Sequence, residues 1–598
     1  MSVIELGDSI PSLTSHAVSM SLPTWADNVG YEEGDKQIWD KLTTGYPRFF
    51  IHKSIDAFAD AIIARYGNPN QKAMLFPSTT SAQRCRDFIK AKGEPSLTGD
   101  VEVVDMVLHR EEETSEIIAK ISPSISAVVY HSDLFPVAKQ YWQHSGDGIS
   151  SRRAEFCHSL FSDGKLVAAA LPQPVMNQKK GPKRYQRASI DNTPSLLDNK
   201  VSPKRNSNAA EIQESTQFLE ERFGRNLDIS LINNAKVSLR RRIAGPLTDE
   251  MNLAAVEPSS PEKTSSSRGV TPDDVYLYPC GMNAIFSTHR MLLQSRGQRK
   301  SISFGFPYVD TLKILQKFGP GCKFYGHGSS EDLDDLEARL QAGERYLALF
   351  CEFPGNPLLK TPDLKRIRKL AEAYDFAVVV DDTIGTSINV HVLPYADIVV
   401  SSLTKIFSGD CNVMGGSAIL NPQGRYYHSL KKAYEADHEG NNNYWAEDII
   451  FMERNSRDFI KRIKKINHTA EAICDLLKSH PLVKDVYYPK YNPSTKQFYD
   501  DCRTPDGGYG GLISFVFHKK EHAIAFYDRI ETAKGPSLGT NFTLTSPYVL
   551  LAHYWELDWA GEFGVPLDLL RVSVGVEDTE ELVSRFVVAL KAAEAVGY

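Results

Sequence analysis

Short apolar runs alternate with stretches of helical spacing from residue 275 onward. The apolar runs predict buried strands at 275–278, 301–306, 346–351, 376–380 and 396–400. Apolar residues spaced along one helix face predict helices between them, at 282–296, 308–318, 331–342 and 362–374. Near-continuous apolar strands that alternate with helices are typical of βαβ units. This region therefore predicts an α/β fold with a large, mostly parallel sheet that helices cover on both faces.

The pattern changes after about residue 430. A long helix is predicted at 457–479, strands at 512–517 and 570–574, and a final helix at 578–595. These elements predict a smaller α/β domain at the C-terminal end.

The first 175 residues also have the pattern of a folded region. Apolar runs at 49–51, 73–76 and 125–130 predict short buried segments, and 55–66 has helical spacing. Residues 176–210 are polar and contain too few apolar residues to offset the entropy of ordering, so a flexible linker is expected. The alternative for its basic run is a nuclear or nucleic-acid signal, which the interrupting acidic residues disfavour.

The expected organisation has four parts. They are an N-terminal extension of unknown role at 1–175, the linker at 176–210, a large α/β domain at 211–430, and a connecting helix with the small domain at 431–598. A second exposed loop is expected at 257–269.

Composition and charge exclude several classes. The 598 residues carry 68 Lys and Arg against 75 Asp and Glu, a net charge of −7, which argues against a nucleic-acid or membrane-surface binder. Eight cysteines without a C-x-x-C pair predict neither a disulfide framework nor a structural metal site. No apolar stretch approaches the roughly 18–20 residues that span a bilayer, and the first residues do not resemble a leader, so a cytoplasmic protein is expected.

Ligands bind at the carboxyl ends of strands in an open parallel sheet. The strand predicted at 396–400 runs into Ser402, Thr404 and Lys405. Burying a lysine there costs free energy unless the amine has a role, and an amine can form a Schiff base with a carbonyl. The two hydroxyls are placed to bind a phosphate. The alternative is that the lysine simply reaches solvent.

Other strand ends carry further candidates, each with a structural alternative. Asp381 can hydrogen-bond a protonated pyridine nitrogen or can cap a turn. Gly281 and Met282 begin a helix whose N–H groups can meet a phosphate, or form only a tight turn. Tyr308 can stack on a flat ring or pack at a helix start. Arg571, between apolar neighbours, suits a carboxylate ligand or a structural ion pair.

In chain order, these residues resemble the motifs of the Cys/Met-metabolism family of pyridoxal-phosphate enzymes, and are most similar to its fungal cystathionine γ-synthase type. The similarity covers about 275–590. The matching segments are Cys280-Gly281-Met282, Tyr308, Glu352–Pro357, Asp381-Asp382-Thr383, Ser402–Lys405, Ser537 and Arg571–Asp578.

The resemblance implies the fold of the aspartate-aminotransferase-like PLP-dependent transferases and assigns roles to these residues. Lys405 is implied as the Schiff-base lysine, Tyr308 as the stacking ring and Asp381 as the pyridine partner, and these three form the catalytic set. The implied cofactor-binding residues are Gly281, Met282, Tyr308, Asn356, Asp381, Ser402, Thr404, Lys405 and Arg222. The implied substrate-binding residues are Glu352, Asn356, Ser537 and Arg571.

The implied reaction is γ-replacement on O-succinyl- or O-acetylhomoserine with cysteine, which gives cystathionine in transsulfuration and methionine biosynthesis. The alternatives are a sulfhydrylase that uses sulfide, a cystathionine γ-lyase, and a non-catalytic paralogue that binds cofactor or a partner. The resemblance also implies a homotetramer of dimers that share active sites, with small amino-acid substrates as the other partners.

Three features depart from the family. Cys280 stands where serine is usual in the phosphate turn. Residues 409–412 read Gly-Asp-Cys-Asn where the family reads Gly-His-Ser-Asp. The family also takes a Tyr-x-Arg from the neighbouring subunit to hold the phosphate. Chain order favours Arg222, which lacks the tyrosine. Tyr46-Pro47-Arg48 keeps both residues, and the Leu-Phe-Pro-Ser-Thr-Thr that follows at 75–80 echoes Leu-Tyr-Pro-Cys-Gly-Met at 277–282.

Overall fold

The computed structural model describes most of the chain. The described residues are 4–47, 49–109, 118, 121, 123–169, 231–245, 269–437 and 443–597. Arg48, Arg222, the expected linker at 176–210 and nearly all of the expected loop at 257–269 lie outside them. The four-part division of the chain stays a prediction.

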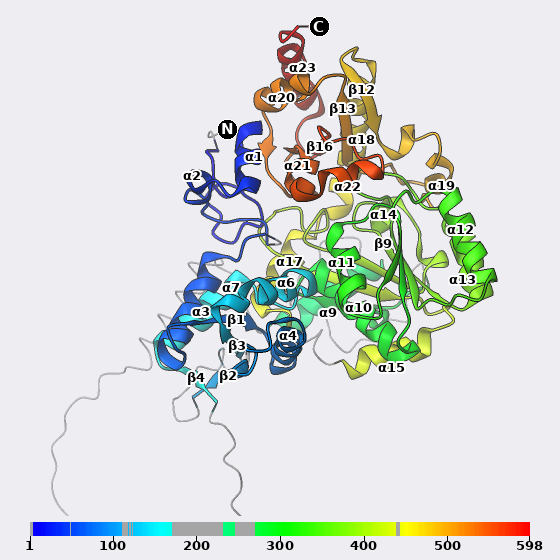
Figure 1. Ribbon diagram of the computed structural model, residues 1–598. Helices are drawn as coiled ribbons and strands as arrows, with labels where there is room; N and C mark the ends of the chain where they lie inside the picture. Colours follow the sequence, from blue (N-terminus) through cyan, green and yellow to red (C-terminus); the bar gives the residue numbers. More distant parts are fainter. Residues whose placement is uncertain are drawn as a thin grey trace, which may run out of the picture.

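A seven-stranded sheet forms the centre of the molecule (Figure 1). Its strands, in spatial order, are β5 (Val275–Tyr278), β11 (Gly416–Leu420), β10 (Ile398–Ser402), β9 (Ala377–Asp381), β8 (Ala348–Glu352), β6 (Ser301–Phe304) and β7 (Cys322–Tyr325). The run from β10 to β7 is parallel, and β11 pairs antiparallel with both β10 and β5. The expected α/β fold with a mostly parallel sheet is confirmed.

Helices cover both faces of this sheet. One face packs against α9 (Ile232–Ala244), α12 (Ser330–Gln341), α13 (Leu364–Tyr374) and α17 (Ala446–Asn455). The other packs against α10 (Gly281–Arg296), α11 (Val309–Lys317) and α15 (Tyr427–Ala436). Side chains alternate between the two faces along each strand, so Val378 and Val380 lie in the first core and Ala377 and Val379 in the second. This alternation explains why the strands read as continuous apolar runs.

The C-terminal part contains a second sheet of five strands. In spatial order they are β12 (Val483–Tyr487), β13 (Leu512–Phe517), β16 (Leu570–Ser573), β15 (Leu544–Ser546) and β14 (Ala533–Lys534). The helices of this part are α18 (Phe459–Ser479), α19 (Lys496–Asp500), α20 (Lys520–Arg529), α21 (Tyr548–His553), α22 (Leu557–Glu562) and α23 (Thr579–Glu594). The long helix at 457–479 and the final helix at 578–595 are confirmed within two residues at each end.

The N-terminal part consists of an arm and a small layered unit. The arm, residues 4–52, carries α1 (Trp25–Glu33) and α2 (Lys36–Trp39). The unit, residues 53–169, has an antiparallel sheet in the order β1 (Gln71–Phe76), β3 (Ile125–His131), β2 (Glu102–Leu108) and β4 (Leu166–Ala168). Its helices are α3 (Lys53–Tyr66), α4 (Thr79–Lys92), α6 (Phe135–Ser145) and α7 (Ser151–Ser162). Residues 49–51 do not form the expected buried segment, because they are half-buried and Phe49 and Phe50 border a cavity.

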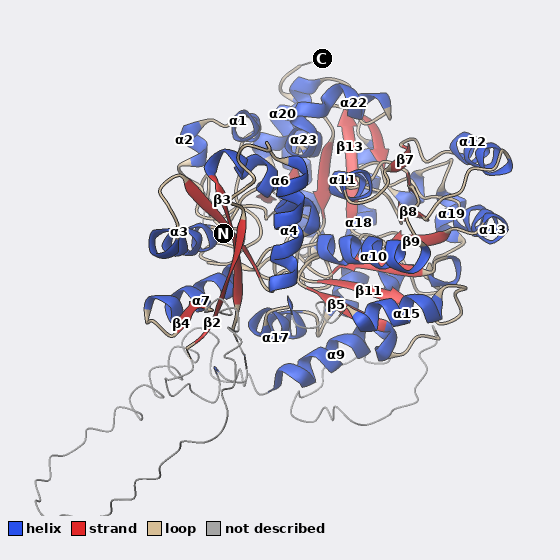
Figure 2. Cartoon of the chain, turned by 60° about the horizontal axis from the view of Figure 1, so that its bottom comes forward, coloured by secondary structure: helices blue, strands red, loops and turns tan. Residues whose placement is uncertain are grey.

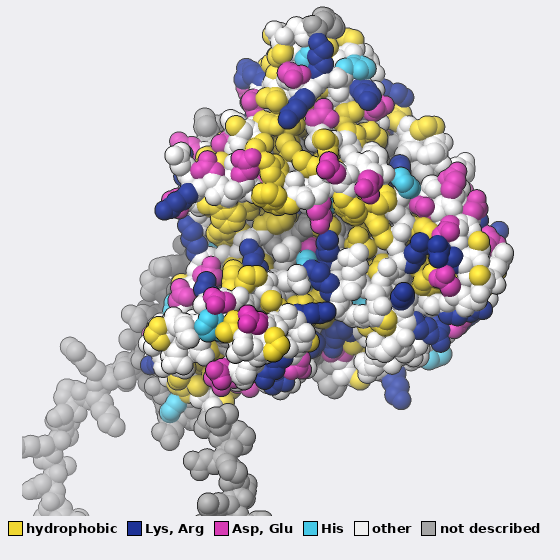
Figure 3. Space-filling model, in the orientation of Figure 1, with side chains coloured by type: hydrophobic (Ala, Val, Ile, Leu, Met, Phe, Trp, Pro, Cys, Tyr) yellow, Lys and Arg dark blue, Asp and Glu magenta, His cyan; other side chains and the backbone are white. Residues whose placement is uncertain are grey.

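The N-terminal unit packs against the central sheet region as part of one core. Helix α6 contacts α10 and α11, and α4 lies beside α6 (Figure 2). Buried residues of both parts, such as Phe76, Tyr141, Phe286 and Leu315, belong to one continuous apolar cluster. The arm instead contacts the C-terminal part, where hydrophobic side chains gather along the junction (Figure 3).

A buried ion pair also joins the N-terminal unit to α17. Arg152 is buried, and its Nη1 lies 3.1 Å from Asp448 Oδ1. Its guanidinium also stacks 4.1 Å above the centre of the Phe451 ring. Burial raises the pKa of the Asp448 carboxyl, and Arg152 opposes that shift.

We expect Arg152→Ala to lower the free energy of unfolding by about 3–5 kcal/mol, because it leaves a buried carboxyl without the cation that contacts it. Denaturant unfolding would measure this. Arg339→Ala is the matched control, since Arg339 pairs with Asp335 at the surface and such pairs contribute about 1 kcal/mol or less. Equal losses in the two variants would contradict the prediction.

Candidate active site

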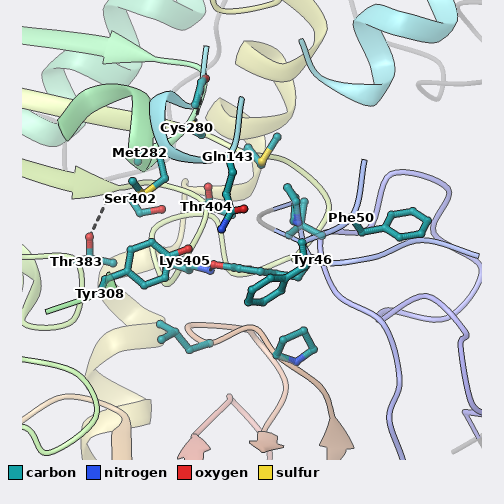
Figure 4. Close-up of a pocket in the computed structure, with 18 of the residues that line it drawn as sticks. Tyr46, Phe50, Gln143, Cys280, Met282, Tyr308, Thr383, Ser402, Thr404 and Lys405 are labelled. Atoms are coloured by element: carbon teal, nitrogen blue, oxygen red, sulfur yellow. Dashed lines mark hydrogen bonds between the residues drawn. The ribbon is translucent and has the colours of Figure 1, made fainter. Parts of the chain in front are cut away.

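A cavity of about 220 Å³ lies where the three parts of the chain meet. The ends of β8, β9 and β10 line it, together with the arm, the loop after α6, and residues before β15 and in β16. Figure 4 shows Lys405 at its centre, with Tyr308 on one side and Tyr46 on the other. Among the described residues, no group of His, Cys, Asp and Glu side chains is arranged to hold a metal ion.

Lys405 lies three residues beyond the end of β10 and is 8% exposed. Its Nζ donates hydrogen bonds to the Tyr46 hydroxyl at 3.0 Å and to Ser537 Oγ at 3.4 Å. The Thr404 hydroxyl accepts from the Gly415 N–H at 3.1 Å and donates to the Gly415 carbonyl at 3.3 Å. The turn that carries Lys405 is therefore tied to the residue just before β11.

Two carboxyl groups lie side by side at the ends of neighbouring strands. Glu352 and Asp381 are paired in the register of β8 and β9. Burial, followed by the nearby Asp381, raises the pKa of Glu352 from 4.5 to about 8. Burial likewise raises the pKa of Asp381, whose Oδ1 accepts from the Thr383 N–H at 2.9 Å. Glu352 accepts from the backbone N–H groups of Tyr308 and of Asn356.

The first turn of α10 forms a cradle for an anion. The helix is 16 residues long, and its N-cap residue Cys280 makes no side-chain capping bond. A side chain at Gly281 would place its Cβ 2.7 Å from the Cβ of Ser402, so only glycine allows this close approach. The N–H groups of a helix start, beside a serine hydroxyl, are suited to a phosphate. Burial raises the pKa of the Cys280 thiol to about 11, so the cysteine adds no negative charge.

Arg571 lies on the opposite side of the cavity. It is 2% exposed and donates to the Ser537 carbonyl at 2.9 Å, the Pro536 carbonyl at 3.1 Å and Asn356 Oδ1 at 3.3 Å. Its guanidinium stacks 4.1 Å above the centre of the Tyr548 ring. Burial lowers the pKa of Arg571, and the groups that oppose this shift are the hydroxyls of Tyr548, Tyr46 and Tyr308. Among the described residues no carboxylate is paired with it, so the alternative of a structural ion pair finds no support there.

Most of the residues singled out from the sequence therefore meet in one cavity. Those that line it are Gly281, Met282, Tyr308, Glu352, Asn356, Asp381, Ser402, Thr404, Lys405 and Arg571, and Ser537 reaches Lys405 directly. Arg222 and Arg48 lie outside the described residues. Tyr46, which belongs to the alternative segment for the family's Tyr-x-Arg, contacts Lys405.

Sequence reasoning missed the residues that hold Arg571 and cover the cavity. Tyr548 stacks on Arg571, and its hydroxyl accepts from Asn356 Nδ2 at 2.8 Å. Gln143 reaches the cavity from α6 (Figure 4). Neither residue follows a predicted strand or belongs to a recognisable motif, so no local signal marks them.

Comparison with known proteins identifies the family. The sequence profile of the Cys/Met metabolism PLP-dependent enzymes matches residues 270–591. The chain belongs to this family. The profile of the fungal trans-sulfuration enzyme N-terminal domain matches residues 54–150, which lie in the N-terminal unit. The predicted family and its cofactor, pyridoxal phosphate, are thus confirmed, and the chain is a PLP-dependent enzyme.

Several relatives extend over the whole chain. A cystathionine γ-synthase of Neurospora crassa is 57% identical over 99% of both chains. A cystathionine γ-synthase of Saccharomyces cerevisiae is 38% identical over 98% of this chain and 99% of its own. A crystal structure of cystathionine γ-synthase from Xanthomonas oryzae pv. oryzae, in complex with aminoacrylate and cysteine, is 22% identical with a TM-score of 0.49. It covers 61% of this chain and 99% of its own. Among the described helices, none is long and apolar enough to cross a membrane.

The raised pKa of Glu352 gives the cofactor-free protein a pH-dependent stability. Between 4.5 and about 8 the folded protein retains a proton that the unfolded chain has released. The stability from this proton is complete below the unfolded pKa and is lost as pH rises to about 8. Glu352→Gln cannot titrate, so its free energy of unfolding should fall less between about pH 5 and about pH 8.

Urea unfolding of the cofactor-free protein at the two pH values would measure this difference. Glu331→Gln is the control, because Glu331 is at the surface and its pKa is lowered, which places its titration below this range. A pH dependence for Glu352→Gln equal to that of the unmodified protein would show that this carboxyl does not titrate in the range.

Proposed function

We propose that this protein is a cystathionine γ-synthase, which replaces the γ-substituent of an activated homoserine ester with the sulfur of cysteine. The observation that carries the proposal is the 57% identity to a cystathionine γ-synthase over 99% of both chains. The site supports it, because a buried lysine, a buried arginine and two partly buried carboxyl groups face one cavity at the strand ends.

The residues of the cavity fit pyridoxal phosphate. Lys405 is the amine that would hold its aldehyde, and Asp381 is the carboxyl that would face its ring nitrogen. The first turn of α10, at Gly281 and Met282, and the hydroxyls of Ser402 and Thr404 would hold the phosphate. Tyr308 would stack on the ring. When bound, the cofactor provides an electron sink that stabilises negative charge on the carbon atoms of an amino acid.

Arg571 would bind the carboxylate of the amino-acid substrate. A planar guanidinium can offer two parallel N–H groups to a carboxylate, and that pairing is strongest where water is excluded. The carbonyls of Pro536 and Ser537 and the amide of Asn356 fix its orientation before any substrate arrives. Tyr548 covers one guanidinium face and so leaves the edge for the ligand.

Lys405 would move protons to and from the substrate once its amine is free. A general acid and base must lie within hydrogen-bond reach of the proton that it transfers. Its bonds to Tyr46 and Ser537 orient the amine between β10 and the C-terminal sheet. Glu352 binds the backbone at Tyr308 and Asn356, and so positions both the stacking ring and the amide that contacts Arg571. A cytoplasmic location stays a prediction from the sequence, and a tetramer stays a prediction that rests on the resemblance.

The reaction can be tested by product analysis of the purified holoenzyme. We expect cystathionine from O-succinyl- or O-acetylhomoserine with cysteine, and identical reactions without enzyme are the control. Homocysteine formed only from sulfide would indicate a sulfhydrylase, and breakdown of cystathionine alone would indicate a γ-lyase. Absence of conversion in all combinations would indicate a non-catalytic paralogue.

The role of Lys405 can be tested by borohydride reduction and peptide mass analysis. The reduced cofactor should be found on the peptide that contains Lys405, and Lys405→Ala should lose both this adduct and turnover, by about 10²–10⁴-fold or more. Lys365→Ala is the control, because Lys365 is half-exposed and pairs with Asp501 away from the cavity. An adduct on another lysine would contradict the assignment.

A further inference from the structure

The N-terminal part of the chain contributes directly to the active site of the same chain. The Tyr46 hydroxyl lies 3.0 Å from Lys405 Nζ, although the two residues are 359 positions apart. The arm is fixed close by, because the Val18 N–H donates to the carbonyl of Cys411 at 2.9 Å and the Thr44 hydroxyl donates to the carbonyl of Ala17 at 2.8 Å. Figure 4 shows Tyr46 reaching toward Lys405 from the arm, while Phe50 lies farther from the lysine.

The loop after α6 also contributes to the site, because it contacts the first turn of α10, where an anion would bind. Asn283 Nδ2, in the first turn of α10, donates to Asp147 Oδ1 at 2.7 Å and to the carbonyl of Ser145 at 3.4 Å. Cys280 Sγ donates to the carbonyl of Gly146 at 3.6 Å. Gly146 has a φ of +64°, and a Cβ there would lie 2.7 Å from the backbone nitrogen of Asn283. The N-terminal unit therefore closes the cavity on the side where a phosphate would lie.

The N-terminal unit also repeats part of the central fold. Strand β1 ends in Leu-Phe, followed by Pro77, the N-cap Ser78 and α4. Strand β5 ends in Leu-Tyr, followed by Pro279, the N-cap Cys280 and α10. The two N-cap residues have nearly the same extended backbone, with φ and ψ of −148° and 156° at Ser78 and −159° and 168° at Cys280. The two segments are therefore similar in local structure as well as in sequence.

The contact between the repeated units has the character of a protein interior. The ring of Tyr141 from α6 lies 6.2 Å from that of Phe286 and 5.8 Å from that of Phe318. His144 Nδ1 lies 2.9 Å from Asp310 Oδ1, and both side chains are buried. An apolar core with paired buried polar groups is typical of a permanent interface. Helices α10 and α11 are therefore covered from within the chain.

We propose that the N-terminal part, residues 4–169, takes the place of a neighbouring subunit at this active site. Each chain then holds a complete site, with Tyr46 of that chain as the residue that positions Lys405. This differs from the shared active sites that the family resemblance implies. The inference rests on the proposed role of Lys405. It gives the N-terminal extension a function, which is to replace the neighbouring subunit with a smaller unit of the same chain.

Tyr46→Phe removes the hydroxyl that contacts Lys405 and keeps the ring. We expect kcat/KM to fall about 10- to 100-fold, the usual effect of losing one hydrogen bond to a charged group. The pH midpoint of the visible absorbance of the bound cofactor should also shift, which a merely structural role would not produce. Tyr66→Phe is the matched control, because the Tyr66 hydroxyl bonds only to the Ala168 N–H in the described contacts and lies outside the cavity. An unchanged midpoint in Tyr46→Phe would overturn the proposal.

A hybrid of two variants decides whether Tyr46 acts within its own chain. Chains with Tyr46→Phe and chains with Lys405→Ala are co-expressed with different affinity tags, and hybrids are isolated through both tags. The only cofactor-bearing lysine then belongs to the chain that lacks the Tyr46 hydroxyl. We expect the midpoint of the Tyr46→Phe protein, and its activity per site that retains Lys405, because each site uses its own Tyr46.

A hybrid with the midpoint of the unmodified protein would show that Tyr46 comes from the other chain, and would overturn the proposal. Failure to form hybrids, with the unmodified protein still holding cofactor as a single chain, would support it. Loss of the Lys405 adduct in the unmodified protein would refute the proposed function instead, so the two failures are distinguishable.

Discussion

The amine of Lys405 is the constraint on which the rest of the site depends. A nearly buried amine requires hydrogen-bond partners, and this one finds them in two distant segments, Tyr46 of the arm and Ser537 before β15. The Ser537 carbonyl in turn orients Arg571. The central sheet alone therefore provides the lysine but neither the environment of its nitrogen nor the arginine across the cavity.

Periodicity predicted the central fold because each strand is buried on both faces. The strands that were missed have a physical reason for their weak signal. Strand β11 begins Gly-Ser-Ala, small residues that fit between β5 and β10 but do not read as an apolar run. Strand β7 lies at the edge of the sheet, and its residues are mostly half-buried. Strand β2 carries Glu102 and Asp105 and is only partly buried, so its sequence does not form a continuous apolar run.

The candidate site was predictable where chemistry coincides with a strand end. Lys405, Asp381 and Glu352 follow strands that could be recognised, and their side chains meet because parallel strands end at one edge. Tyr548 and Gln143 could not be found in this way, since they reach the cavity from helices that no motif marks. Tyr46 carried a motif, but its approach to Lys405 of the same chain is a tertiary fact that no local pattern encodes.

The arm and the lysine belong to one polypeptide, and this affects how the active site depends on protein concentration. A site assembled from two molecules obeys mass action and is lost on dilution. A tethered segment instead meets its target at an effective concentration that is set by chain geometry. With Tyr46 and Lys405 on one polypeptide, the integrity of each catalytic centre does not depend on how many copies the cell makes.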